Sequence, residues 1–137
     1  MGKEFCSWKK FEEGVEVLLS KIGTPDYLIA IPRGGLVLGM RLSHELDNPL
    51  AAYDTDSMKK LDPGLLGLLV DDISDTGNAF LSALDKLYGI KISTASLYVK
   101  PKTLYVPQYY AFETSEWIVF PWERKTEDSV KASWKFL

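Results

Sequence analysis

Two adjacent carboxylates and a turn of small residues follow one apolar run of this chain. The run Leu68-Leu69-Val70 leads into Asp71 and Asp72, and the sequence Asp-Thr-Gly-Asn-Ala occupies residues 75–79. Small side chains let consecutive backbone N–H groups converge on an anion where a helix begins, so this turn suits a phosphate. Two carboxylates beside that anion would repel it unless the ligand also offered sugar hydroxyls and a divalent cation. A phosphorylated sugar bound with Mg²⁺ fits both features.

The place of this motif between a strand and a helix supports that interpretation. Buried strands of open α/β sheets point their carboxyl ends at the ligand crevice, and an apolar strand ending at Val70 would deliver the acids there. The alternative is a plain crossover in which Asp75 or Thr76 caps the helix, with Asp71 and Asp72 solvated. Capping alone does not account for two acids at a strand exit, so we favour a ligand site.

The stretch from Val70 to Ala79 resembles the 5-phosphoribosyl-1-diphosphate (PRPP) signature of the type I phosphoribosyltransferases. In that family the acidic pair addresses the ribose hydroxyls and magnesium, and the turn holds the 5-phosphate. The resemblance therefore assigns ribose and Mg²⁺ binding to Asp71 and Asp72. It also implies that Asp75 is the catalytic general base. The residues it assigns to 5-phosphate binding are Asp75, Thr76, Gly77, Asn78 and Ala79.

A second turn, Pro32-Arg33-Gly34-Gly35, follows an expected strand and opens the next predicted helix. Two glycines permit close approach of the backbone, and an arginine adds a permanently charged, multidentate donor. An Arg-Gly-Gly turn is often only a turn, but this one belongs to the other strand–helix loop expected at the crevice. The family has a pyrophosphate-binding loop here. The resemblance thus assigns pyrophosphate to Arg33, Gly34 and Gly35, and it predicts a cis Pro32–Arg33 peptide bond.

A third segment, from Trp117 to Glu123, places aromatic residues on both sides of a proline. By itself it is as readily core or a hydrophobic flap as a binding site. It looks like the C-terminal hood of xanthine/guanine and hypoxanthine phosphoribosyltransferases, which closes over the purine. The resemblance implies that Lys100 reaches the purine 6-oxo group and that Trp117 stacks on the ring. It gives Ile118 a main-chain hydrogen bond to the base and Glu123 a part in reading the 2-substituent.

Helical and strand patterns alternate along the chain and provide the frame for these motifs. Apolar residues at helical spacing predict helices that begin after Ser7, at Leu36 and after Ala79, the last closed by Gly89. This alternation implies an α/β fold with a mostly parallel central sheet flanked by helices. By resemblance it is the type I phosphoribosyltransferase fold, a single domain over residues 1–137 with 100–123 as the base-binding hood. The expected strands cover residues 27–31, 50–53, 65–70, 90–99 and 109–112.

Composition and charge exclude several classes of protein. The 137 residues suffice for one domain with a single core, and the 46% hydrophobic and 26% charged residues are ordinary for a globular protein. A net charge of −3 leaves no electrostatic footprint for nucleic acid. The single cysteine, Cys6, excludes an internal disulfide and suits a reducing compartment. We see no signal-peptide or membrane-length apolar run, so we expect a cytoplasmic protein without a membrane partner.

The preferred interpretation is a purine salvage transferase that uses Mg²⁺. It would convert guanine, xanthine or hypoxanthine, which the sequence does not rank, and PRPP to the nucleoside 5′-monophosphate and pyrophosphate. The Trp-Ile and Lys-Pro segments disfavour a pyrimidine base. Because the family commonly pairs subunits, we expect a homodimer or a higher homo-oligomer.

One departure from the family pattern favours an alternative function. Asp54 to Leu65 is shorter than the mobile loop that family members close over PRPP, although Lys59 and Lys60 can still supply cations to the pyrophosphate. A short loop suits a non-catalytic PRPP-binding regulator on the same fold. The residues that the resemblance assigns to a base pocket and a general base would have no use in a pure sensor, so their presence favours the enzyme. The tail, Lys125 to Leu137, is expected to pack on the body or on a second subunit, or to fray.

Overall fold

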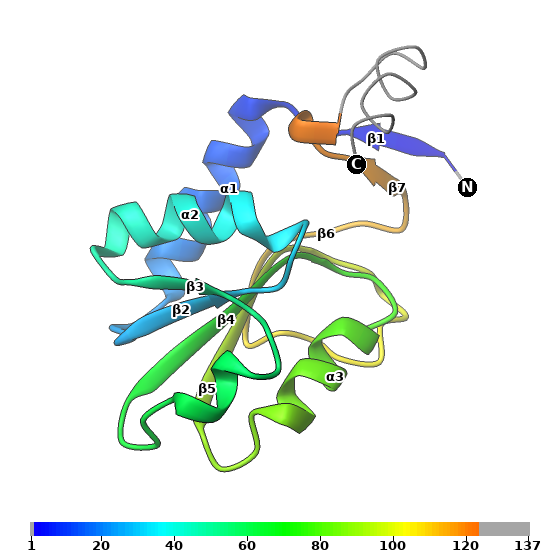
Figure 1. Ribbon diagram of the computed structural model, residues 1–137. Coiled ribbons are helices and arrows are strands. Elements are labelled where there is room, and N and C mark those ends of the chain that lie inside the picture. The colour runs from blue at the N-terminus through cyan, green and yellow to red at the C-terminus, as the bar shows by residue number, and fades with distance from the viewer. Residues whose placement is uncertain (1, 124–137) are drawn as a thin grey trace, which may run out of the picture.

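Five parallel strands form the central sheet, and the computed structural model describes them within residues 2–123 (Figure 1). Their order across the sheet is β3-β2-β4-β5-β6, and every neighbouring pair is parallel. The predicted α/β fold with a parallel central sheet is therefore confirmed. The strands are β2 (Tyr27–Ala30), β3 (Leu50–Ala52), β4 (Leu66–Ser74), β5 (Lys91–Val99) and β6 (Tyr109–Glu113).

Three helices cover the two faces of this sheet. Helices α1 (Trp8–Lys21) and α2 (Gly35–Leu46) lie on one face, and α3 (Asn78–Lys86) lies on the other (Figure 1). Successive side chains of a strand point to opposite faces, which divides the core into two clusters. Leu68 packs with the α1 and α2 side chains, whereas the adjacent Leu69 packs with those of α3.

The ends of the helices agree with the sequence except at α3. The Ser7 hydroxyl accepts a hydrogen bond from the Lys10 backbone N–H (3.0 Å) and caps α1 as predicted. Helix α3 ends earlier than the sequence suggested, with Leu87 as its C-cap, so the prediction that Gly89 closes it directly is wrong. Gly89, at φ 86°, instead belongs to the turn that leads into β5. Within residues 2–123, no helix is long and apolar enough to cross a membrane.

Strand β4 runs further than predicted, and this changes the setting of the acidic pair. The predicted end was Val70, but the strand continues to Ser74, so Asp71 and Asp72 lie within it. Pairing with β2 stops at Ala30–Val70, whereas pairing with β5 continues to Ser74–Val99. From Asp71 onward, β4 therefore has a ladder partner on one side only.

A second, two-stranded sheet stands beyond the carboxyl ends of the central strands (Figure 1). Strand β1 (Lys3–Phe5), which the sequence did not predict, pairs in parallel with β7 (Trp117–Val119). A 3₁₀ turn, η2 (Pro121–Glu123), follows β7. We call β1, β7 and η2 the hood; of the 100–123 region, residues 109–113 belong instead to the central sheet as β6. The tail expected to pack or fray, 125–137, lies outside the described residues.

Candidate active site

The arginine turn that follows β2 lies beside the acidic pair of β4. The Ile31 N–H donates to the Val70 carbonyl oxygen (2.8 Å), so the two chains remain joined where the turn begins. A Cβ on Gly35 would stand 2.5 Å from the same carbonyl oxygen, and one on Gly34 would overlap the Asp72 carboxylate. The Pro32–Arg33 peptide bond is cis, as predicted. Glycines here allow the arginine turn to contact the acidic pair directly.

Asp71 is shielded from water, whereas Asp72 is partly exposed, so the alternative in which both acids are simply solvated is wrong. Asp71 is 8% exposed, and its Oδ1 accepts a hydrogen bond from the Asp72 backbone N–H (2.8 Å). Burial, together with the neighbouring charge of Asp72, raises the pKa of Asp71 to about 8. Burial also raises the pKa of Asp72, and Glu123 adds to this effect. The fold thus opposes ionisation of this pair, and a cationic ligand would favour it.

This pair suits a magnesium ion that arrives with a phosphorylated substrate. Within the described part of the chain, no group of three or more His, Cys, Asp or Glu side chains could hold a metal by itself. Mg²⁺ is commonly bound through one or two carboxylates, with substrate phosphates and water completing its octahedron. The oxygen donors of Asp71 and Asp72 match that requirement.

The turn over residues 75–79 forms the start of α3. Gly77 adopts φ 92° as the N-cap residue, and the Thr76 hydroxyl accepts from the Asn78 N–H (3.2 Å). The N-cap residue, being glycine, makes no side-chain hydrogen bond. Backbone N–H groups and the positive end of the helix dipole therefore face the space where the turn opens.

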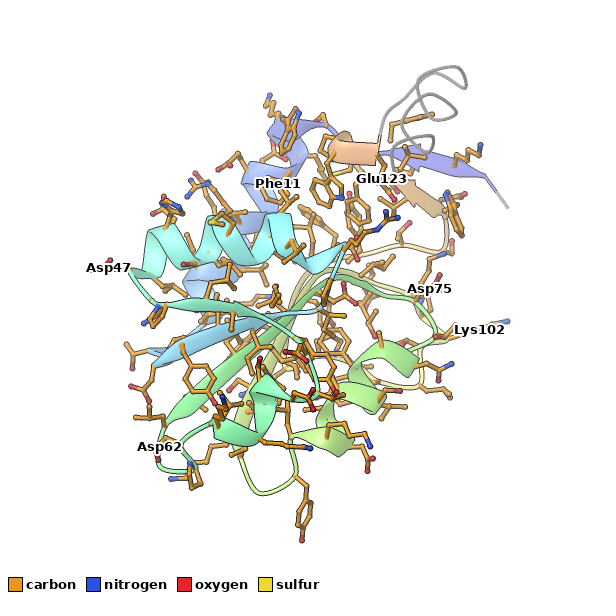
Figure 2. All side chains as sticks on the ribbon, in the orientation of Figure 1. Phe11, Asp47, Asp62, Asp75, Lys102 and Glu123 are labelled. Carbon is orange, nitrogen blue, oxygen red and sulfur yellow. The ribbon has the colours of Figure 1, made fainter. Side chains whose placement is uncertain are left out.

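A cavity of about 170 Å³ joins this turn to the hood. Lys100, at the end of β5 and only 8% exposed, points its Nζ to within 4.0 Å of Asp75 Oδ1. Figure 2 labels Asp75, in the loop before α3, and Glu123, in η2. The structure brings together all the residues predicted to bind a base. The lining residues are Asp72, Ile73, Asp75, Lys100, Trp117, Ile118, Phe120 and Glu123.

A larger hollow of about 430 Å³ lies between α1 and α2, with Trp8, Phe11 and Met40 among its lining residues. It contains none of the predicted site residues and is mostly apolar. We therefore assign the chemistry to the smaller cavity, where a cation and several carboxylates converge.

Two residues have contacts that the sequence did not reveal. Glu123 Oε1 accepts from the Phe120 N–H (3.0 Å), so this carboxylate caps η2 as well as lining the cavity. Ser74, for which the sequence indicated no functional role, is buried and donates its hydroxyl to the Tyr105 carbonyl oxygen (2.6 Å). Its partner is 31 residues away along the chain, and no local pattern signals such a contact.

Comparisons with known proteins agree with this geometry. The phosphoribosyl transferase domain model matches residues 3–128. Xanthine-guanine phosphoribosyltransferase of Chromohalobacter salexigens is 30% identical over 134 residues, covering 85% of this chain and 82% of the relative. The protein of the same name from Desulfotalea psychrophila is 29% identical over 140 residues, with 88% and 86% covered. Among solved structures, the purine phosphoribosyltransferase of Pyrococcus horikoshii is 34% identical, with a TM-score of 0.81 and coverage of 92% and 97%.

Proposed function

The chain belongs to the phosphoribosyl transferase domain family and is an enzyme of that class, and we propose that it acts on purines. The reaction would join a 6-oxopurine (guanine, xanthine or hypoxanthine) to the ribose of PRPP, releasing pyrophosphate and the nucleoside 5′-monophosphate. The observation that carries this proposal is the cavity that links the 75–79 turn to Lys100 and the hood. The names of the three similar proteins reported above, each a purine enzyme, point the same way.

The hood offers a planar base a ring face and, within residues 2–123, a backbone edge of β7 that faces away from β1. Trp117 is 57% exposed and lines the cavity, so one face of its indole is accessible for stacking. The Trp117 N–H donates to the Gly2 carbonyl, and the Val119 carbonyl accepts from Cys6. Alternate residues of a strand direct their backbone groups to opposite edges, so those of Ile118 point away from β1. That edge can read a purine through the main chain.

The charges of the site suit the bond that must break. Cleavage of the C1–O bond of PRPP builds positive charge on the ribose and negative charge on the departing pyrophosphate. Fixed groups aimed at developing charge usually provide the largest catalytic contribution. We assign Arg33, Gly34 and Gly35 to the pyrophosphate, and Asp71 and Asp72 to the ribose and Mg²⁺. When bound, Mg²⁺ would neutralise charge on the phosphates.

Proton transfer is assigned to Asp75. A purine whose edge faced both Asp75 and Lys100, whose charged atoms are 4.0 Å apart, would meet a carboxylate and an ammonium within the same cavity. Lys100 can donate to the 6-oxo oxygen, while Asp75 accepts the proton that the purine must lose. The remaining turn residues, Thr76, Gly77, Asn78 and Ala79, would hold the 5-phosphate through backbone N–H groups.

The short segment between β3 and β4 is attached to the body of the protein. Met58, in a 3₁₀ turn (η1, Ser57–Lys60), is buried in the same cluster as Ile29 and Leu69. Lys59 and Lys60 are exposed, and we keep their contact with pyrophosphate as part of the proposal. A homo-oligomer and a cytoplasmic location also stay predictions.

The test is to incubate the protein with PRPP and Mg²⁺ and with guanine, xanthine or hypoxanthine in turn, and to follow nucleotide and pyrophosphate formation. We expect nucleotide from at least one oxopurine and none from uracil or orotate. Product from a pyrimidine alone would contradict the purine assignment. PRPP binding without product from any base would instead favour the regulatory alternative.

A further inference from the structure

The loop between β5 and β6 folds back against the 75–79 turn. We call residues Thr103–Tyr105 the clamp. The Leu104 N–H donates to the Thr76 carbonyl oxygen (2.8 Å). A Cβ on Gly77 would stand 2.6 Å from the Tyr105 nitrogen and 2.9 Å from Thr103 Oγ1, so the clamp leaves no space behind this residue. The turn assigned to the 5-phosphate is thus supported from behind by a segment distant in sequence.

The Ser74 hydroxyl holds the clamp in this place. Ser74 is 1% exposed, and its Oγ lies 2.6 Å from the Tyr105 carbonyl oxygen and 2.9 Å from Thr103 Oγ1. Each hydroxyl has one proton. If Ser74 donates to Tyr105, Thr103 is left to donate to Ser74 or to the same carbonyl, 3.2 Å away. A buried hydroxyl without a partner is costly, and both partners of the Ser74 hydroxyl belong to the clamp, so Ser74 favours the clamp in this position.

The same contacts reach the predicted base-binding cation. The Lys100 N–H donates to the Ser74 carbonyl oxygen (3.0 Å), and the Thr103 N–H donates to that of Lys100 (3.2 Å). At the far end of the clamp, the Tyr105 ring stacks on Phe80 (5.4 Å between centroids). Ser74 therefore stands where the end of β4, the end of β5 and the clamp meet.

We propose that Ser74 is a positioning residue that fixes the phosphate-binding turn relative to Lys100 through the clamp. The inference rests on the proposed function, since it concerns the same site, and it gives Ser74 no contact with substrate. Small displacements of a binding group reduce turnover or affinity strongly. Ser74→Ala should raise KM for PRPP by roughly tenfold. KM for the purine should change less than twofold, because β5 and burial still hold Lys100.

Ser43→Ala provides a matched control. The Ser43 hydroxyl donates to the Asn48 carbonyl oxygen over the same distance, 2.6 Å, at the far end of α2. Both variants lose one hydroxyl–carbonyl hydrogen bond, so a merely structural role would lower Tm in both and leave the ratio of the two KM values unchanged. We expect the KM ratio to change in Ser74→Ala alone.

A second variant and a binding measurement complete the test. Thr103→Val removes the partner hydroxyl with little change of shape. The double variant should raise KM for PRPP no more than Ser74→Ala does, because both substitutions disrupt the same hydrogen-bonded group. Calorimetric titration with ribose 5-phosphate should show a loss of affinity as large as the rise in KM for PRPP, and it needs no turnover.

If the natural chain makes no nucleotide but Ser74→Ala still weakens the binding of ribose 5-phosphate, the proposed function fails and the positioning role stands. Three results would overturn the positioning role of Ser74. They are an unchanged ribose 5-phosphate affinity in both single variants, no binding of ribose 5-phosphate to the natural chain, or an equal loss of affinity in Ser43→Ala.

Discussion

Two clusters of charged side chains in this molecule are arranged in opposite ways. Between α1 and α2, Arg41 donates from Nε to Glu12 Oε1 (2.9 Å) and from Nη1 to Glu45 Oε1 (2.6 Å), all three partly exposed. In the crevice, the acidic side chains of Asp71 and Asp72 are adjacent, and Asp71 is buried. Hydrogen bonds to the Glu12 and Glu45 carboxylates raise the pKa of Arg41, so these opposite charges stabilise one another.

The charged groups around Arg41 stabilise the fold, whereas the acidic pair Asp71 and Asp72 is arranged to bind a ligand. Opposite charges near the surface are each satisfied, and little changes when a substrate binds. Adjacent acids disfavour ionisation of one another, and a cationic ligand can relieve that cost. Active sites commonly keep such costs because function requires them. Substitutions in the crevice should therefore reduce function more than stability, and those at Arg41 should affect stability alone.

The largest expected effect is at Asp75. Asp75→Asn removes the proposed proton acceptor with little change in shape, and general-base catalysis is typically worth about 10²–10⁴-fold. We expect kcat to fall by about that factor while PRPP affinity stays within a few-fold. Steady-state kinetics and calorimetric PRPP titration measure the two quantities. A collapse of PRPP affinity would instead mean that Asp75 mainly shapes the 75–79 turn.

Asp71→Asn should separate function from stability within the acidic pair. The substitution removes a proposed ligand, so the affinity for Mg²⁺ and PRPP should fall at least about tenfold. Because the pKa of Asp71 is about 8, binding by the natural chain should also strengthen as pH rises toward 8. Titrations at pH 6, 7 and 8 test both statements. Affinity that falls with rising pH would contradict them.

The stability of the same variant should change in the other direction. Between about pH 4 and pH 8 the Asp71 carboxyl is ionised in the unfolded chain but protonated in the folded one, so the folded state binds the extra proton. The free energy of unfolding of the natural chain should then decrease as pH rises, by at most about 1.4 kcal/mol per pH unit from this group. Asp71→Asn should lack that contribution and gain in relative stability at pH 8. Urea denaturation of both proteins at pH 5 and pH 8 measures this difference. An equal change in the free energy of unfolding between the two pH values in the natural chain and in Asp71→Asn would refute the prediction.

A third substitution extends the comparison to the hood. Trp117→Ala removes the proposed stacking face; base–aromatic stacking is worth about 1–3 kcal/mol, so KM for the purine should rise roughly tenfold. Trp8→Ala is the control, since Trp8 is 54% exposed against 57% for Trp117 but packs on Phe11 and Trp122 instead of lining the cavity. It should lower Tm and change KM for the purine less than twofold. Equal changes of KM in both variants would show that Trp117 only supports the hood.

The residues that do chemistry were more predictable than the contacts that hold them. The Asp71–Ala79 and Pro32–Gly35 motifs carry local signals, because a strand end, small residues and helical spacing occur within a few positions. The arginine turn then reaches the acidic pair because β2 and β4 are neighbours, a strand order that the sequence did not predict. Roles at the site remain proposals, but the placement of these residues around one crevice could be predicted from the pattern.

What the sequence did not indicate depends on distant partners. Strand β1 is three residues long and forms only because β7, more than a hundred residues later, offers an edge. Strand β4 passes Val70 because β5 keeps pairing with it, although the apolar run has ended. Ser74 lies in that added stretch, and its partner on the clamp is fixed by tertiary packing alone. Such contacts have no periodicity to read along the chain.

Arg41→Ala should have the smallest effect and gives the comparison its strictest test. Partly exposed ion pairs contribute about 1 kcal/mol or less, since water hydrates the carboxylates left behind. We expect a loss of that size in the free energy of unfolding, reduced at high salt by screening, and no change in kcat or either KM. Helix α2 begins at Gly35, inside the turn assigned to pyrophosphate. If loosening the α1–α2 contact raised KM for PRPP, the surface cluster would also be positioning the site, and the two clusters would not be separate in function.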